Sequence, residues 1–126
     1  MTPFGKVLSQ LRRSRKLQQK QLAEAIGIEA SYVSALEGGK KSPPSRLVLS
    51  KLIDFLNLSD EELQALESSI GPSERVIRLP NSVSLEEYDF LWELRKRLGS
   101  LSREELMIMT SALKLGSTNF KKEKIE

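Results

Sequence analysis

The sequence of 126 residues contains no cysteine and no histidine. These two absences exclude thiol nucleophiles, disulfide bonds, histidine-assisted proton transfer and zinc sites built from cysteine and histidine. The chain also lacks a glycine-rich phosphate-binding loop and any cluster of residues with the spacing of metal ligands. We therefore expect a protein that is not an enzyme and that has no catalytic residues, no metal site and no cofactor.

Long hydrophobic runs are missing as well. No apolar segment approaches the roughly 20 residues that are needed to cross a bilayer. The first ten residues, MTPFGKVLSQ, lack the basic and then apolar layout of a signal peptide. The sequence therefore predicts a soluble, cytoplasmic protein that does not associate with a membrane.

Acidic and basic side chains are unevenly divided along the chain. Residues 1–58 carry ten lysines and arginines against four acidic residues, whereas residues 59–126 carry ten against thirteen. The net charge of +3 therefore conceals +6 in the first part and −3 in the second. A basic excess that is confined to one part of the chain indicates that this part binds a polyanion.

The most informative segment is residues 17–43, LQQKQLAEAIGIEASYVSALEGGKKSP. It predicts two short helices over 19–26 and 30–36, joined at Gly27, which adopts the positive φ of a tight turn without steric cost. Ala23 is small enough to lie where the two helices cross, and an apolar stripe faces the rest of the domain. This pattern is typical of a helix-turn-helix, whose second helix enters the major groove of DNA.

The sequence around this pair also favours helices. Apolar residues recur at steps of three and four along residues 3–16 and after two serines, Ser45 and Ser59, which stand where helix N-caps are expected. We therefore predict an all-α first domain over residues 1–67, built from five short helices.

The second half contains turns followed by two more helices. Glycine, proline and serine residues between 68 and 83 indicate a linker, in which 75–79 is either a short strand or an irregular extended segment. Two Ser-x-x-Glu capping boxes then predict a helical hairpin over residues 84–115. The polar and charged residues 116–126 are expected to form a frayed tail.

Two helices alone cannot bury an apolar stripe on each member. We expect the hairpin to dock on the same hairpin of a second chain, which would produce a symmetric dimer interface. The alternative is that the same side chains form core contacts within one chain. The candidate interface residues are Leu91, Trp92, Met109 and Leu113.

A family resemblance rests on a set of residues within the first half of the chain. They are Leu11-Arg12, Leu17, Gln19, Leu22-Ala23, Gly27-Ile28, Ser31-Tyr32-Val33-Ser34, Leu36-Glu37, Gly39-Lys40 and Pro43. Through them the sequence from Leu11 to Leu58 resembles the lambda-repressor-like DNA-binding domains of the XRE and Cro/repressor type. The resemblance implies a five-helix fold that binds operator DNA as a dimer to regulate transcription. The C-terminal half resembles no family that we can name.

The resemblance also implies roles for individual residues. The expected base-reading residues are Ala30, Ser31, Ser34 and Ala35, and the expected DNA-backbone residues are Gln19, Lys20, Arg12, Tyr32, Gly39, Lys40 and Lys41. Arg12 is further expected to pair with Glu37, which would hold it near the DNA backbone. Tyr32 has two open roles, because it either donates its hydroxyl to a phosphate or only packs its ring.

Two features of the helix-turn-helix depart from the pattern that the family prefers. The expected N-cap positions hold Gln18 and Glu29, which cap poorly, so each helix start is predicted to be weaker by about 0.5–1 kcal/mol. The groove-facing set lacks arginine, lysine, asparagine and glutamine, the side chains that make bidentate base contacts. We therefore expect DNA shape, dimer spacing and phosphate contacts to carry much of the recognition.

These observations together predict a sequence-specific transcriptional regulator, by default a repressor, that binds a palindromic operator as a homodimer and lies on the nucleoid when bound. A second hypothesis is a protein-interaction module, such as an antitoxin-like or anti-repressor partner that acts through the hairpin. An enzyme is the third hypothesis, and the missing histidine and cysteine disfavour it.

Overall fold

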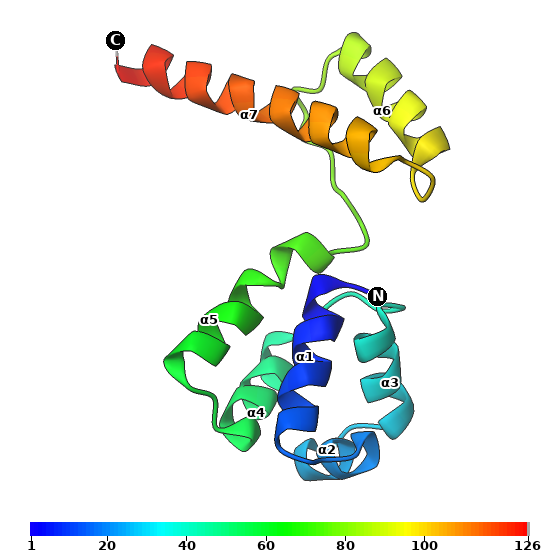
Figure 1. Ribbon diagram of the computed structural model, residues 1–126, viewed down its shortest axis with the longest axis vertical. Helices are drawn as coiled ribbons and strands as arrows, with labels where there is room; N and C mark the ends of the chain where they lie inside the picture. The colour runs from blue at the N-terminus through cyan, green and yellow to red at the C-terminus, as the bar shows by residue number, and fades with distance from the viewer. Residues whose placement is uncertain (126) are drawn as a thin grey trace. The chain divides into compact units, whose positions relative to one another are not determined.

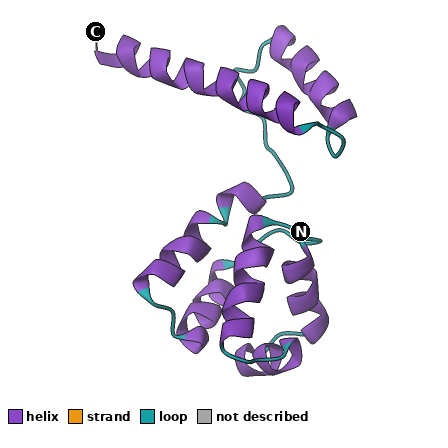
Figure 2. Ribbon diagram, in the orientation of Figure 1, coloured by secondary structure: helices purple, strands orange, loops and turns teal. Residues whose placement is uncertain are grey.

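The computed structural model describes the backbone of residues 1–125 and the side chains of residues 1–116. Over this range the chain is helical and contains no strand, which confirms the predicted all-α class (Figure 2). The chain divides into two compact units, Met1–Arg78 and Leu79–Glu126. None of the helices within the described range is both long enough and apolar enough to cross a membrane.

The first unit contains five α-helices and one 3-10 turn (Figure 1). They are α1 (Pro3–Ser14), α2 (Gln19–Ile26), α3 (Ala30–Gly38), α4 (Arg46–Leu56), α5 (Asp60–Ser68) and η1 (Gly71–Ser73). Local signals explain their bounds. The Ser59 hydroxyl accepts from the Glu62 N–H at 3.2 Å at the start of α5, and Gly27 ends α2 with a φ of 74°.

Apolar side chains from all five helices meet in one core. The core residues are Phe4, Leu8, Leu11, Leu22, Ala23, Ile26, Val33, Leu36, Leu52, Leu56 and Leu66. Ala23 is 1% exposed at the contact between α2 and α3. Burying a leucine side chain contributes about 1.5–3 kcal/mol. This core therefore gives the helix-turn-helix a rigid support.

Helix α1 and the end of α3 approach each other backbone to backbone at Gly5. A Cβ at this position would lie 2.5 Å from the Leu36 carbonyl oxygen and 2.6 Å from that of Glu37. No side chain fits into such a gap without moving the backbone. Gly5 therefore sets the distance between these two helices, a role that no local sequence pattern indicated.

The first unit extends further along the chain than the predicted boundary at residue 67. Ser69 and Ser73 are buried. The Phe4 N–H at the start of α1 donates to the Ser73 hydroxyl at 2.8 Å, and this hydroxyl donates to the Ser69 carbonyl at 2.6 Å. The segment from 68 to 73 therefore satisfies a backbone donor of α1 rather than forming a linker. Residues 75–79 are extended but are not part of a strand.

The second unit contains α6 (Leu85–Arg97) and α7 (Arg103–Ile125). Both helices begin at capping boxes, in which Ser84 and Ser102 accept from the N–H groups of Glu87 and Glu105, each at 3.1 Å. Helix α7 continues to Ile125, past the end that was predicted at residue 115. The side chains of the predicted tail from 117 onwards lie outside the described residues.

Candidate nucleic-acid interface

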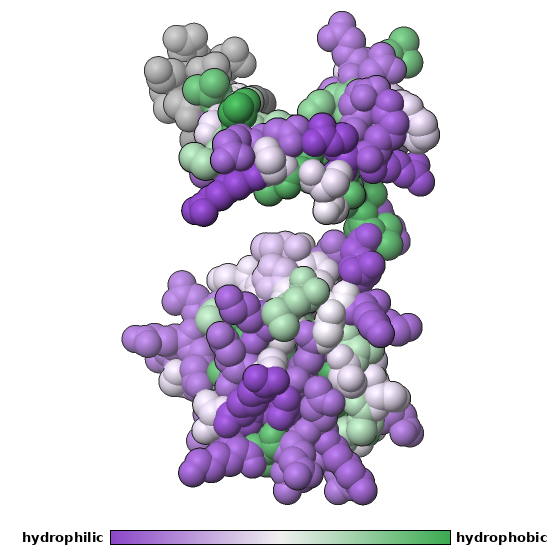
Figure 3. Space-filling view, turned by 45° about the vertical axis from the view of Figure 1, so that its right-hand side comes forward, coloured by the Kyte–Doolittle hydropathy of each residue, from purple (hydrophilic) through white to green (hydrophobic). Residues whose placement is uncertain are grey.

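Helix α3 presents small and polar side chains to solvent. Ala30, Ser31 and Ser34 are exposed and Ala35 is half-buried, whereas the apolar residues of the opposite face, such as Val33, are buried. The side chains that the sequence assigned to base reading therefore lie on one accessible surface. Much of the first unit's surface in Figure 3 is hydrophilic.

A buried ion pair joins α1 to the end of α3. The Arg12 guanidinium donates from Nε to Glu37 Oε2 at 2.7 Å and from Nη2 to Glu37 Oε1 at 2.9 Å. A third bond runs from Arg12 Nη1 to the Leu17 carbonyl at 2.7 Å. Arg12 is 8% exposed and Glu37 is 5% exposed. The structure thus contains the pair that the family resemblance implied.

The electrostatics of this pair favour the charged forms. Burial by itself would raise the pKa of Glu37, but hydrogen bonds from Arg12 and Gln19 and the Arg12 charge outweigh it and lower the pKa. The hydrogen bond to Glu37 raises the pKa of Arg12, against the opposing effect of burial. Both groups stay ionised at neutral pH, and the bidentate geometry fixes the angle between α1 and α3.

The burial of Arg12 limits what it can do for DNA. Its guanidinium makes three hydrogen bonds inside the protein and has little surface for a phosphate. Arg12 therefore acts within the fold by positioning α3, and the geometry does not make it a direct contact to the DNA backbone. The Gln19 side chain belongs to the same network, because its Nε2 donates to Glu37 Oε1 at 3.1 Å.

Arg15, one of the ten basic residues in the first 58 positions, is also used inside the first unit. It donates to both carboxylate oxygens of Glu62, at 2.8 and 3.1 Å, and to the Leu56 carbonyl at 2.6 Å. The Arg15 hydrogen bond, with help from the Ser59 backbone, lowers the pKa of Glu62 to about 2. Arg15 therefore ties the end of α4 to the start of α5 instead of facing DNA.

The cations that remain at the surface of this region are the ones suited to bind phosphates. Arg13, Lys16 and Lys20 are exposed, as are Lys40 and Lys41 in the loop after α3. Charge counting cannot separate these residues from Arg12 and Arg15, because all of them lie in polar stretches of sequence. Arg12 and Arg15 differ from the exposed cations because each has an acidic partner, which lies 25 residues away for Arg12 and 47 residues away for Arg15.

The role of Tyr32 was left open between packing of its ring and a phosphate contact by its hydroxyl. Tyr32 is half-buried and packs its ring against the core, while a phosphate contact by its hydroxyl stays a prediction.

The starts of α2 and α3 are capped differently. At the start of α2 the Gln18 N–H donates to Gln21 Oε1 at 2.8 Å, which satisfies this backbone donor. Glu29 makes no side-chain cap bond at the start of α3.

The loop after α3 is held by contacts that the sequence did not reveal. Gly39 has a φ of 78°, and a Cβ there would lie 2.7 Å from the Thr2 nitrogen, so the N-terminus passes directly beside it. Arg75 donates from Nη1 to the Gly39 carbonyl at 2.8 Å. The Arg75 N–H also donates to the Ser42 hydroxyl at 3.2 Å. A lone arginine in an extended segment carries no sequence signal for such a role.

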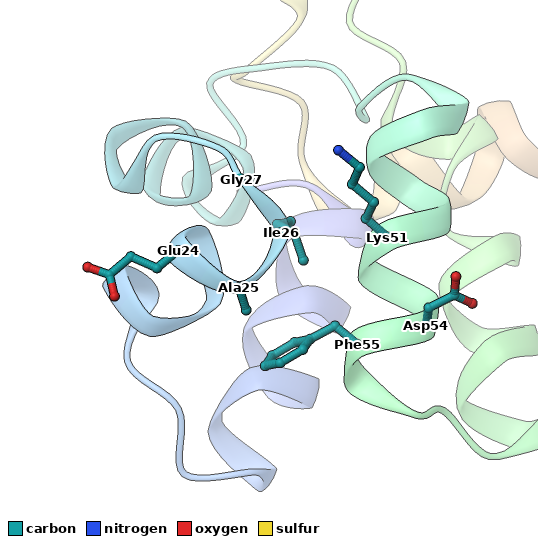
Figure 4. Close-up of a pocket in the computed structure, with 7 residues that line it drawn as sticks. All are labelled: Glu24, Ala25, Ile26, Gly27, Lys51, Asp54 and Phe55. Atoms are coloured by element: carbon teal, nitrogen blue, oxygen red, sulfur yellow. The ribbon is translucent and has the colours of Figure 1, made fainter.

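An open hollow lies between α2 and α4, and Ala25, Ile26 and Phe55 contribute apolar lining (Figure 4). Glu24 and Asp54 stand on its rim from different helices, and their carboxylates point away from each other in Figure 4. This hollow therefore does not bring the two carboxylates together for acid–base chemistry. Among the described residues, no group of three or more acidic side chains is placed to hold a metal ion.

The hairpin leaves most of its apolar side chains accessible. No residue of α6, all of which is described, is buried. Trp92 is 57% and Leu113 is 70% exposed, while Leu91 and Met109 are half-buried. Apolar groups are also visible on the surface of this unit in Figure 3.

The comparisons with known proteins agree with this geometry. A family model described as a helix-turn-helix domain matches residues 3–66. The chain belongs to this helix-turn-helix family, and it is a DNA-binding transcriptional regulator. The family prediction from the sequence is thereby confirmed.

Three relatives from Bacillus subtilis (strain 168) are similar to this chain. The HTH-type transcriptional regulator RghRB is 33% identical over 111 residues, covering 88% of this chain and 77% of its own length. The regulator YobD is 34% identical over 113 residues, covering 89% and 94%. The HTH-type transcriptional repressor RghR is 38% identical over 63 residues, covering 50% and 47%.

Among solved structures, a chain of the SinR protein/SinI protein complex is similar at 19% identity and a TM-score of 0.46. The match covers 91% of this chain and 98% of that one.

Proposed function

We propose that this regulator is a repressor that binds a palindromic operator as a homodimer, with each α3 in a major groove. The observation that carries the proposal is the accessible face of α3, with Ser31 and Ser34 exposed on a helix that a buried core and an ion pair hold in place. The name of RghR, a repressor similar over the helix-turn-helix part, supports repression rather than activation.

Phosphate contacts supply most of the affinity in this proposal. The exposed Lys20, Lys40 and Lys41 reach the DNA backbone, and the half-buried Gln19 adds the second N–H of its amide, whose Nε2 also donates to Glu37. Each phosphate that is neutralised contributes a slope of about −0.9 to the dependence of log K on log salt. Serine hydroxyls and alanine methyl groups on α3 discriminate bases less strongly than bidentate side chains do. DNA shape therefore contributes to the choice of operator.

Dimerisation through the hairpin is the second part of the proposal. A helix pair that exposes Trp92 and Leu113 contains apolar area that a second copy can cover symmetrically. Two copies also match the two half-sites of a palindrome, about 34–36 Å apart. Leu91 and Met109, the other two candidate interface residues, are half-buried.

Sequence selection from random duplexes, combined with the mass of the protein in solution, tests the proposal. We expect a palindromic consensus and a mass of two chains. A variant with Gln19→Ala and Lys40→Ala is expected to bind all duplexes more weakly without a change in the selected sequence. Ser31→Ala or Ser34→Ala is expected to change the selected sequence. Identical behaviour of the two groups of variants would contradict the docking.

The exposed hairpin also supports a second candidate function, the capture of a different protein. In that case the protein is monomeric alone and the hairpin residues Trp92 and Leu113 are needed for its activity in the cell. Lys40→Ala together with Lys41→Ala would then leave that activity unchanged. The repressor proposal expects the opposite result, because it requires both lysines.

A further inference from the structure

Three distant parts of the first unit meet at the loop that follows α3. The Arg75 side chain reaches the Gly39 carbonyl, and the Arg75 backbone reaches the Ser42 hydroxyl, across 36 and 33 positions of sequence. Met1 and Thr2 pass beside Gly39 on another side. The loop is therefore held by contacts at its first residue, Gly39, and by a hydrogen bond at Ser42.

The two tied residues flank the two lysines of the loop. Gly39 comes directly before Lys40, and Ser42 comes directly after Lys41. Lys40 is also fixed through its own backbone, because its N–H donates to the Ala35 carbonyl at 3.0 Å. The lysine side chains remain exposed. The backbone that carries two exposed cations is thus restrained on both sides before any ligand arrives.

We propose that Arg75 is a positioning residue for DNA-backbone binding, because it holds Gly39 and Ser42 so that Lys40 and Lys41 meet the phosphates in a preset geometry. This inference rests on the proposed function, in which the two lysines contact DNA. A loop that is ordered in advance loses less conformational freedom on binding than a free one does, so more of its interaction energy appears as affinity.

The arrangement assigns Arg75 a role that differs from that of an ordinary phosphate contact. Its Nη1 is engaged with the Gly39 carbonyl inside the first unit. Its effect on DNA is therefore expected to pass through the loop, and to vanish when the lysines of the loop are absent. A direct contact would act independently of them.

A double-mutant cycle tests this dependence. Affinity for a labelled duplex of mixed sequence is measured for Arg75→Ala, for Lys40→Ala with Lys41→Ala, and for all three changes together. The matched control is Arg78→Ala, which removes the same charge from an exposed arginine of the same segment. We expect Arg75→Ala to weaken binding about 3- to 10-fold, Arg78→Ala at most about 2-fold, and Arg75→Ala to add almost nothing in the lysine-free background.

Two results of the cycle would overturn the proposal. If Arg75→Ala weakens binding equally with and without the lysines, Arg75 touches phosphate directly. If Arg75→Ala weakens binding no more than Arg78→Ala does, the hydrogen bonds of Arg75 to Gly39 and Ser42 do not affect the affinity for DNA. Thermal unfolding of each variant is recorded alongside, so that a loss of folded protein is not counted as a loss of affinity.

Amide hydrogen exchange without DNA provides a readout that is independent of binding. We expect Arg75→Ala to speed exchange at residues 40–42 about 10-fold or more, with Arg78→Ala unchanged. The charge-neutral Ser42→Ala, which removes only the acceptor of the Arg75 N–H, should produce a smaller change in the same direction. If the wild-type protein binds no duplex, the proposed function fails. Unchanged exchange in Arg75→Ala would instead overturn the positioning role itself.

Discussion

The two units of this protein differ in how they use their apolar residues. The first unit buries side chains from five helices in a closed core. The hairpin has two well-capped helices but no buried residue on α6. Helix formation and burial are therefore separate properties here. Capping and periodicity are enough to start both kinds of helix, but only the first unit has enough elements to cover its own apolar surface.

The largest expected effect tests the link between α1 and α3. Arg12→Ala leaves the Glu37 carboxylate buried without its main partner, and we expect a loss of about 3–5 kcal/mol in the free energy of unfolding. Urea denaturation of the full chain measures it. Arg13→Ala is the matched control, since this neighbouring arginine is exposed, and its expected change is within about 0.5 kcal/mol. Equal effects of the two substitutions would show that the ion pair does not stabilise the fold.

The contrast between the units can be tested with one leucine from each. Leu22, which is 0% exposed, and Leu113, which is 70% exposed, are each replaced by alanine. We expect Leu22→Ala to cost about 2–5 kcal/mol in urea denaturation because it leaves a cavity. Leu113→Ala is expected to leave the unfolding of the first unit unchanged and to lower the fraction of dimer in sedimentation. A Leu113 variant with an unaltered dimer fraction would remove this residue from the interface.

The stability of the protein at low pH also distinguishes the two units, because the Arg15–Glu62 ion pair belongs to the first unit. The pKa of Glu62 is about 2 in the folded protein, below its ordinary value of 4.5. Its contribution to stability is therefore present above pH 4.5 and is lost as the pH falls from 4.5 towards 2. We expect Glu62→Gln to flatten the pH dependence of urea unfolding in this window. Glu86→Gln in the hairpin is the control and should leave this pH dependence unaltered.

The smallest expected effect concerns the start of α3. Glu29 makes no cap bond there, so Glu29→Ser is expected to stabilise the first unit by about 0.5–1 kcal/mol. Thermal unfolding measures the gain. Glu24→Ser is a control, because it removes the same charge from the body of α2, where serine provides no cap. A gain of the same size in both variants would point to charge rather than capping.

Much of the local structure could be predicted because its causes lie within a few residues. The turn at Gly27, the capping box of Ser59 with Glu62 and the apolar stripe of α2 each depend on neighbours in sequence. The face of α3 that carries Ser31 and Ser34 follows from helical periodicity alone. The end of α7 was less predictable, because a single glycine inside a helical pattern does not by itself end the helix.

The candidate site was predictable only in part, because several of its residues act through distant partners. Arg12 and Arg15 belong by sequence to the basic excess of residues 1–58, yet acidic residues on other helices hold them inside the unit. Arg75 lies in a segment that was assigned to a linker, and only its bond to Gly39 gives it a role. No pattern within the sequence records such a pairing.

The sequence by itself determined the helical class, the helix-turn-helix and the excess of positive charge near it, because these depend on local propensity, periodicity and composition. The tertiary structure decided which cations near the helix-turn-helix stay exposed, how closely α1 approaches α3 at Gly5, and where the first unit ends. Those properties depend on which atoms come within hydrogen-bonding or contact distance after folding, and the partners are as far as 69 residues apart.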